Sequence, residues 1–120
     1  MKNIKLYTYK NCQTCKKATK LLDGLKISFK EIPIEITPPT NKELKLALEQ
    51  NGGQLKKLFN TSGQLYREMG LSKKLQDISE DKALELLQEH GMLVKRPFLC
   101  INSEQTALGF KEDVWRTLIK

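Results

Sequence analysis

The residues best suited to chemistry are two cysteines in the stretch Cys12-Gln13-Thr14-Cys15. The preceding residues 4–9 alternate in polarity and favour a β-strand, and the residues that follow are apolar at helical spacing: Ala18, Leu21, Leu22 and Leu25. Cys12 is therefore expected at a helix N-terminus, where free backbone N–H groups and the helix dipole stabilise an anion. Several cationic residues lie close in sequence: Lys10, Lys16, Lys17 and Lys20. The Cys12 thiol should ionise below its usual pKa of about 8.5, which gives the nucleophilic thiolate.

Cys15 lies one helical turn deeper than Cys12. It would resolve a mixed disulfide or sulfenate on Cys12 and form an intramolecular disulfide, and the alternative is a packed, inert thiol. Cys100 lies in an apolar run and is interpreted as a core residue, and His90 as a cap or dipole partner at a helix C-terminus. The cysteines and the single histidine lack the spacing of a four-ligand zinc site, so no metal is predicted.

Size and composition predict one domain over residues 1–120. A hydrophobic share of 39% with 29% charged residues is typical of a globular protein, and no apolar run approaches the roughly 20 residues of a membrane span. The chain starts on a strand without a signal-peptide pattern, and its CxxC suits a reducing compartment, so we expect a cytoplasmic protein. The net charge of +7 allows anionic partners. Direct nucleic-acid binding is not expected, because the lysines are dispersed and the aromatic residues do not interleave with them.

The order of predicted elements is β-α-β, a helical block over about residues 40–91, then β-β-α. Strands are expected over 3–9 and within 27–36, where Pro33 interrupts or turns the chain, with a helix over 12–24 between them. In the helical block, Thr40 and Glu43 have the spacing of a capping box, and Gly91 is expected as a C-cap. Other helical segments are expected at 54–59, 64–69, 72–78 and 80–90. The last third predicts strands over 98–101 and 106–110, and a helix over 111–119 with Val114 and Trp115 facing inward.

A CxxC that opens the first helix, and a proline just before a later hairpin strand, resemble the layout of the thioredoxin fold. With the helical block, the whole chain resembles the arsenate reductase (ArsC)/Spx family, as an α/β thioredoxin-like fold with a mixed sheet. The matching segments are residues 9–15, 59–63, 66–68 with Leu71, 93–99 and 108–112. The resemblance implies a cis peptide bond between Arg96 and Pro97, against the active-site loop.

The same resemblance supplies candidate site residues. Cys12, Cys15 and Arg96 would be catalytic, with Arg96 stabilising negative charge through its forked donors. The expected substrate-binding residues are Asn11, Asn60, Thr61 and Pro97. For Asn60, Thr61 and Ser62, capping of the next helix is an equally good interpretation.

The chain also departs from the family pattern. The glutaredoxin-coupled arsenate reductases use one catalytic cysteine, which Cys12 matches, and three arginines around the oxyanion, of which only Arg96 is matched. Asn60 stands where the first arginine is expected, Phe110 lies in the region of the third, and Thr8 replaces a histidine. Cys15 is extra and resembles the CxxC of the Spx-type regulators, whose longer C-terminal tail has no counterpart here.

The residues and the resemblance predict a thiol-dependent oxidoreductase, in which Cys12 attacks arsenate or a glutathione mixed disulfide. Glutathione, glutaredoxin or thioredoxin would regenerate the thiols, no bound cofactor is needed, and a monomer is expected. The alternative is a non-enzymatic regulator in which the Cys12–Cys15 disulfide switches affinity for a protein partner such as RNA polymerase. A thioredoxin-like fold with a vestigial site is a third hypothesis.

Overall fold

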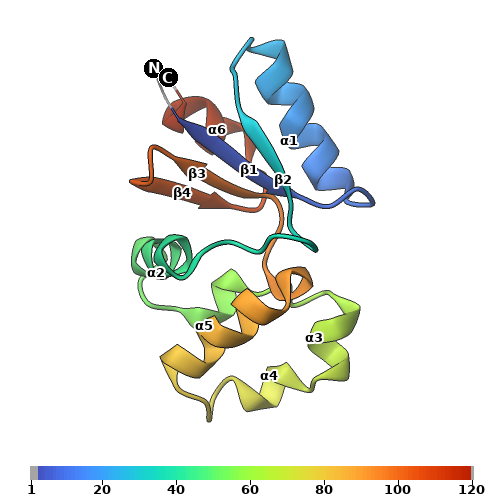
Figure 1. Cartoon of the computed structure of the whole chain (residues 1–120), viewed down its shortest axis with the longest axis vertical. Helices are drawn as coiled ribbons and strands as arrows, with labels where there is room; N and C mark the ends of the chain where they lie inside the picture. Colours follow the sequence, from blue (N-terminus) through green and yellow to red (C-terminus); the bar gives the residue numbers. More distant parts are fainter. Residues whose placement is uncertain (1–2, 120) are drawn as a thin grey trace.

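A mixed four-stranded sheet forms the centre of the computed structural model, which describes residues 3–119 (Figure 1). The strands lie in the order β2-β1-β3-β4. Their bounds are β1 Ile4–Thr8, β2 Lys30–Pro33, β3 Phe98–Ile101 and β4 Gln105–Leu108. β1 pairs in parallel with β2 and antiparallel with β3, and β3 pairs antiparallel with β4. The α/β class and the thioredoxin-like order of elements are as predicted.

Helices cover the sheet on both faces. Two of them, α1 (Gln13–Gly24) and α6 (Glu112–Leu118), pack on one face (Figure 1). The chain between β2 and β3 forms the helical block, on the other side of the sheet. Its helices are α2 Asn41–Gln50, η1 Leu55–Leu58, α3 Gln64–Glu68, α4 Leu71–Lys74, α5 Glu80–Glu89 and η2 Gly91–Leu93. Within residues 3–119, no helix is both long and apolar enough to cross a membrane.

Two hydrophobic clusters follow from the alternation of side chains along the strands. On the α1 and α6 face, Leu6 and Leu99 pack with Leu22 and Trp115. The other cluster joins the sheet to the helical block and includes Tyr7, Ile34, Leu44, Leu84, Phe98 and Cys100. Cys100 is buried, as predicted. Because β1 and β3 contribute to both clusters, they hold the two halves of the chain together.

Side-chain caps set several helix starts. Thr40 and Glu43 form the predicted capping box of α2, in which the Glu43 N–H donates to Thr40 Oγ1 at 3.1 Å and the Thr40 N–H donates to Glu43 Oε1 at 2.9 Å. Ser79 caps α5, since its hydroxyl oxygen accepts a hydrogen bond from the Lys82 N–H at 3.1 Å. In contrast, α3 has Gly63 as its N-cap without a side-chain capping bond, so Asn60, Thr61 and Ser62 do not cap it.

Several predicted boundaries differ from the structure. The stretch 27–36 turns at Pro33 as predicted, where the Ile36 and Thr37 N–H groups both donate to the Pro33 carbonyl, but its strand is limited to Lys30–Pro33. The C-cap of α5 is His90 rather than Gly91, which instead begins η2. Val114 is exposed rather than inward, because it lies on the outer side of α6.

Candidate functional site

Cys12 is the N-cap residue of α1, at the carboxyl end of β1. Its extended backbone turns the chain from the strand into the helix, and its Sγ accepts a hydrogen bond from the Cys15 N–H at 3.2 Å. A second contact, of 3.3 Å, joins Sγ to the Thr14 hydroxyl. Sulfur here takes the place of the oxygen that usually caps a helix, so the first turn of α1 is arranged to hold a thiolate.

The two cysteines of the CxxC differ in ionisation. Partial burial raises the pKa of Cys12, but hydrogen bonds from Cys15 and Thr14 and the charge of Arg96 outweigh burial and leave the pKa below its usual value. Cys15 is only 2% exposed, and burial, followed by its interaction with Cys12, raises its pKa to about 12. Both thiols are free, and because the pKa of Cys12 is lowered and that of Cys15 is raised, Cys12 is the thiol of the pair that ionises first.

Arg96 is held beside the thiol by its neighbours. Its guanidinium lies 5.2 Å from the centre of the Tyr9 ring, and Nη1 donates to the Met92 carbonyl at 3.2 Å. The buried Nε has no hydrogen-bond partner among the described residues. The bond between Arg96 and Pro97 is cis, as the resemblance implied. This arrangement places a permanent positive charge close enough to Cys12 to lower the pKa of its thiol.

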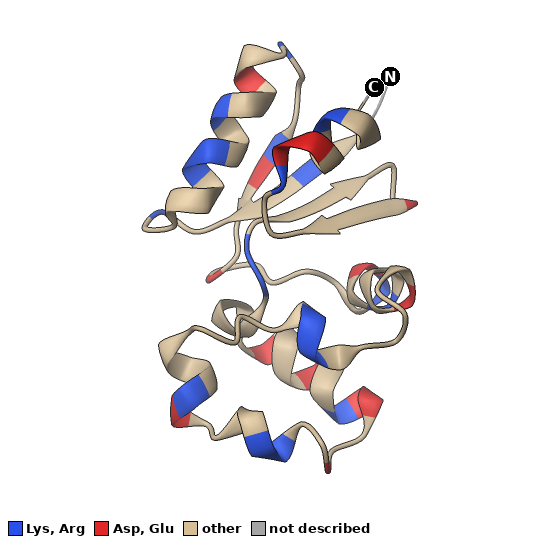
Figure 2. Ribbon diagram, turned by 180° about the vertical axis from the view of Figure 1, so that it is seen from behind, with Lys and Arg blue, Asp and Glu red and all other residues tan. Residues whose placement is uncertain are grey.

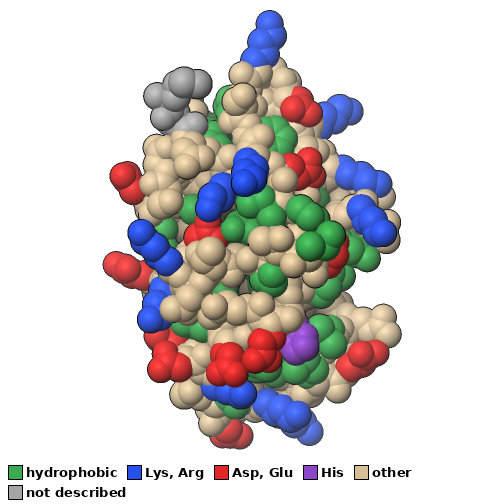
Figure 3. Space-filling view, in the orientation of Figure 1, with side chains coloured by type: hydrophobic (Ala, Val, Ile, Leu, Met, Phe, Trp, Pro, Cys, Tyr) green, Lys and Arg blue, Asp and Glu red, His purple; other side chains and the backbone are tan. Residues whose placement is uncertain are grey.

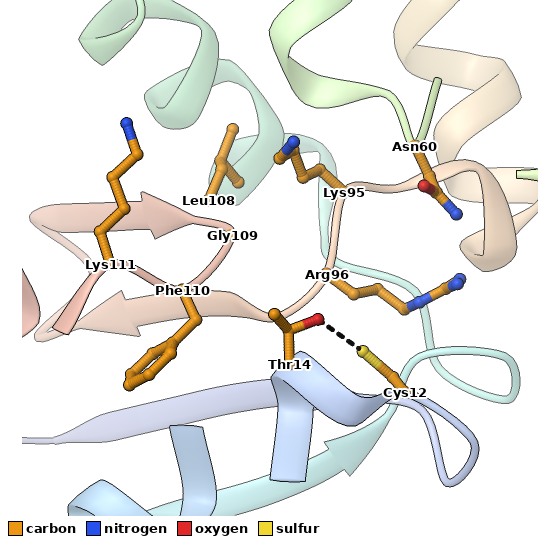
Figure 4. Close-up of a pocket in the computed structure, with 9 residues that line it drawn as sticks. All are labelled: Cys12, Thr14, Asn60, Lys95, Arg96, Leu108, Gly109, Phe110 and Lys111. Carbon is orange, nitrogen blue, oxygen red and sulfur yellow. Dashed lines mark hydrogen bonds between the residues drawn. The ribbon is translucent and has the colours of Figure 1, made fainter. Parts of the chain in front are cut away.

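A cavity of about 360 Å³ opens at Cys12 (Figure 4). The segment before β3, the residues after β4 and the loop before α3 form its walls. Its lining residues are Cys12, Thr14, Asn60, Lys95, Arg96, Leu108, Gly109, Phe110 and Lys111. These described residues include three cations and no carboxylate, so the cavity suits an anionic or electron-rich ligand next to a nucleophilic sulfur.

The predicted site residues are distributed unevenly. Cys12, Arg96 and Asn60 line this cavity, and Cys15 lies buried beneath Cys12. Thr61 lines a neighbouring cavity instead. Asn11 is exposed in the loop before α1 and Pro97 is buried, and neither is among the described residues that line the two cavities.

Lys95, Lys111 and Thr14 were missed as candidates. Thr14 lies inside the CxxC and contacts the sulfur, so its position was a usable signal. Lys95 and Lys111 are separated in sequence and meet only because the β3–β4 hairpin returns the chain to the same edge of the sheet. Because the lysines are dispersed along the chain, the sequence alone gives no indication that these two lie close together. No cluster of three potential metal ligands occurs within residues 3–119.

Comparisons with known proteins agree with this geometry. The ArsC family model matches residues 7–118. The Bacillus subtilis protein YusI, described as uncharacterized, is 48% identical over 92% of this chain and 93% of its own. The global transcriptional regulator Spx of Streptococcus pneumoniae is 29% identical over 97% of this chain and 85% of its own. A possible arsenate reductase from Streptococcus mutans superposes with a TM-score of 0.85 at 40% identity, covering 92% of this chain and 96% of the other. The chain belongs to the ArsC family.

Proposed function

We propose that the protein is a thiol-disulfide oxidoreductase in which Cys12 is the nucleophile and Cys15 the resolving thiol. The observation that carries this proposal is the position of the Cys12 sulfur. It caps α1, accepts a hydrogen bond from the Cys15 N–H and belongs to a residue that lines a cationic cavity. The substrate class we favour is a mixed disulfide that includes glutathione. A reducing compartment such as the cytoplasm would supply the electrons.

The reaction would proceed in two exchanges. The Cys12 thiolate attacks one sulfur of the substrate disulfide, the S–S bond breaks, and the departing thiolate takes a proton from solvent. Cys15 then attacks the Cys12 sulfur, forms the Cys12–Cys15 disulfide and releases the second thiol. Two external thiols, from glutathione or from glutaredoxin or thioredoxin, return two electrons and two protons.

The ionisation of the pair suits this order of events. The Cys12 thiolate contributes to the high pKa of Cys15, through the hydrogen bond and the charge that it places beside that thiol. Once Cys12 is bonded to substrate its charge is gone, so the pKa of Cys15 falls when Cys15 must react. Arg96 lowers the pKa of Cys15 as well as that of Cys12.

Arsenate is a second substrate that the site would accept. Cys12 would displace hydroxide from arsenic, and two thiols would then supply two electrons to release arsenite and end as a disulfide. Only one of the three cations that line the cavity is an arginine, Arg96, and the other two, Lys95 and Lys111, extend away from the sulfur (Figure 4). Lysine provides a point charge without the fork that grips an oxyanion, which is why we place arsenate second.

The test measures thiol-coupled turnover with arsenate and, separately, with a glutathione–peptide mixed disulfide. Cys12→Ser should lower turnover at least about 100-fold, because it removes the nucleophile. Cys15→Ser should leave the mixed disulfide on Cys12, visible by intact mass. Cys100→Ala is the matched control, since it removes a buried thiol distant in sequence. Normal turnover of Cys12→Ser on both substrates would rule out the proposal.

A redox-switched regulator remains the competing function, and the similarity to Spx favours it. In that case the Cys12–Cys15 disulfide would change affinity for a protein partner such as RNA polymerase. The direct measurement is binding of purified RNA polymerase to the reduced and oxidised protein. Equal binding in both states, or none in either, would reject the switch.

A further inference from the structure

A second cavity continues from the Cys12 cavity along the surface. It has a volume of about 480 Å³ and lies between η1 and the end of β4. The two cavities share three lining residues, Lys95, Leu108 and Lys111. The two cavities are therefore adjacent, and together they reach from the reactive sulfur to the helical block; we call the pair the groove. We refer to the far part as the η1 subsite.

The η1 subsite is strongly basic. Lys56 and Lys57 enter it from η1, and Lys95 and Lys111 from the sheet side. All four are exposed, none forms an ion pair with another residue in the range 3–119, and no acidic side chain is among the described residues that line the subsite. Figure 2 shows basic ribbon on η1 and on the connection into β3. A ligand of opposite charge would therefore be attracted to the subsite.

The shared lysines point away from the sulfur. In Figure 4 the side chains of Lys95 and Lys111 lie on the side of Leu108, away from Cys12, whereas Arg96 extends on the side of Cys12. Gly109 leaves room for this course, since it has φ +73° and an added Cβ would lie 3.1 Å from Lys95 Cε. Arg96 thus serves the reacting atoms, and the lysines serve a part of the ligand that lies beyond them.

The uncharged lining favours a peptide over a nucleic acid. Asn51, Gln54 and Thr61 offer donors and acceptors of the kind that pair with a peptide backbone. The aromatic member, Phe59, is only 1% exposed and presents no free ring on which a base would stack. On the face that Figure 3 shows, cationic side chains are interspersed with acidic ones and form no continuous basic band.

From these observations we propose that the η1 subsite binds an acidic peptide segment adjacent to the disulfide of a protein substrate. The inference rests on the proposed function for the position of the disulfide, which lies at Cys12. In this proposal, the helical block selects substrates by their charge. The substrates would be proteins with aspartate or glutamate residues flanking the reactive cysteine.

Two measurements test the subsite. The first is kcat/KM for two glutathionylated peptides that differ only in an Asp/Glu-rich or a Ser/Gln-rich flank. The second is fluorescence anisotropy of the acidic peptide with its cysteine replaced by serine, which needs no redox chemistry. The paired variants are K56E/K57E and, as the control, K73E/K74E, which reverses an adjacent pair of exposed lysines on α4.

We expect the wild-type protein to prefer the acidic peptide about tenfold, and 0.5 M salt to remove most of that preference, since charge steering is screened. K56E/K57E should abolish or invert it, and K73E/K74E should retain it. An unchanged preference in K56E/K57E, or equal loss in both variants, overturns the subsite. Equal competition by a single-stranded oligonucleotide of the same charge also overturns it, because it would indicate generic polyanion binding. Lysine-dependent peptide binding without turnover would instead leave the subsite intact and reject the proposed function.

Discussion

At the scale of single residues, the site separates two thiols that the CxxC sequence makes look equivalent. Cys12 caps α1 and has a lowered pKa, whereas burial, followed by its interaction with Cys12, raises the pKa of Cys15 to about 12. Burial likewise raises the pKa of Cys100. We therefore expect iodoacetamide at pH 7 to label Cys12 at least about tenfold faster than Cys15 or Cys100. Peptide mass mapping over time measures this, with the unfolded protein as the control. Labelling of Cys15 at the rate of Cys12 would contradict the ionisation pattern.

Arg96 gives a second prediction at the same scale. Its charge lowers the pKa of Cys12, so Arg96→Gln should move the midpoint of the alkylation-rate profile to higher pH and slow labelling at pH 7 about two- to fivefold. Arg96→Lys retains the charge and is the matched control for thiol ionisation. Unaltered profiles in both variants would show that the helix terminus alone sets the thiolate.

At the scale of elements, the start of α2 is tied to the sheet through one buried carboxylate. Glu43 is 6% exposed in its side chain and accepts from the Tyr7 hydroxyl at 2.6 Å and from Lys5 Nζ at 3.2 Å, besides its capping bond to Thr40. Burial raises its pKa, but these donors outweigh burial and lower it overall. The stabilisation is therefore present above the unfolded-state pKa of about 4.3 and is lost as pH falls through the folded-state value.

Glu43→Gln should then cost about 2 kcal/mol in the free energy of unfolding at pH 7, and less at pH 3. Urea denaturation at both pH values measures the difference. Glu49→Gln, on an exposed position of the same helix, is the control and should change little. A cost for Glu43→Gln that is the same at both pH values would mean that the carboxylate charge is not the source.

The junction of η2 with the residues after β2 gives another prediction. A Cβ on Gly91 would overlap the Ile34 carbonyl oxygen and crowd Pro38. Gly91→Ala should destabilise the protein by about 3 kcal/mol or more, because backbone would have to move. Gly24→Ala, at the end of α1 with open space around it, should change stability by less than about 1 kcal/mol. Thermal or urea unfolding of the two variants compares them directly, and equal effects would refute the close approach.

The same junction shows what the sequence could and could not predict. Local signals sufficed for α1, for the capping box at Thr40 and for β3, where spacing, a capping pair and an apolar run act over a few residues. Gly91 was assigned to the end of α5 because glycine commonly caps helices. Its actual constraint is a contact with a residue far away in the chain, which no local pattern contains. The lysines of the groove escaped prediction for the same reason.

At the scale of the whole molecule, the two faces of one sheet each pack against a hydrophobic cluster. That residues 1–120 form a single domain stays a prediction. Tyr7 and Phe98 face the helical block, while their strand neighbours Leu6 and Leu99 face α1 and α6. Because neighbouring residues of one strand face opposite sides of the sheet, a strand that becomes disordered loses its packing in both clusters. The two halves of the chain should therefore unfold together rather than in separate steps.

Trp115, the sole tryptophan, reports on one cluster, and a truncation in the other cluster tests the coupling. Leu84→Ala removes a buried side chain of α5 and should cost about 2–4 kcal/mol. We expect the urea midpoint from Trp115 fluorescence to fall as far as the midpoint from far-UV circular dichroism, because β1 and β3 transmit the loss. Thr19→Ala, a surface change in α1, should leave both midpoints nearly unchanged. If Leu84→Ala lowered the dichroism midpoint and spared the fluorescence midpoint, the helical block would be an independent folding unit.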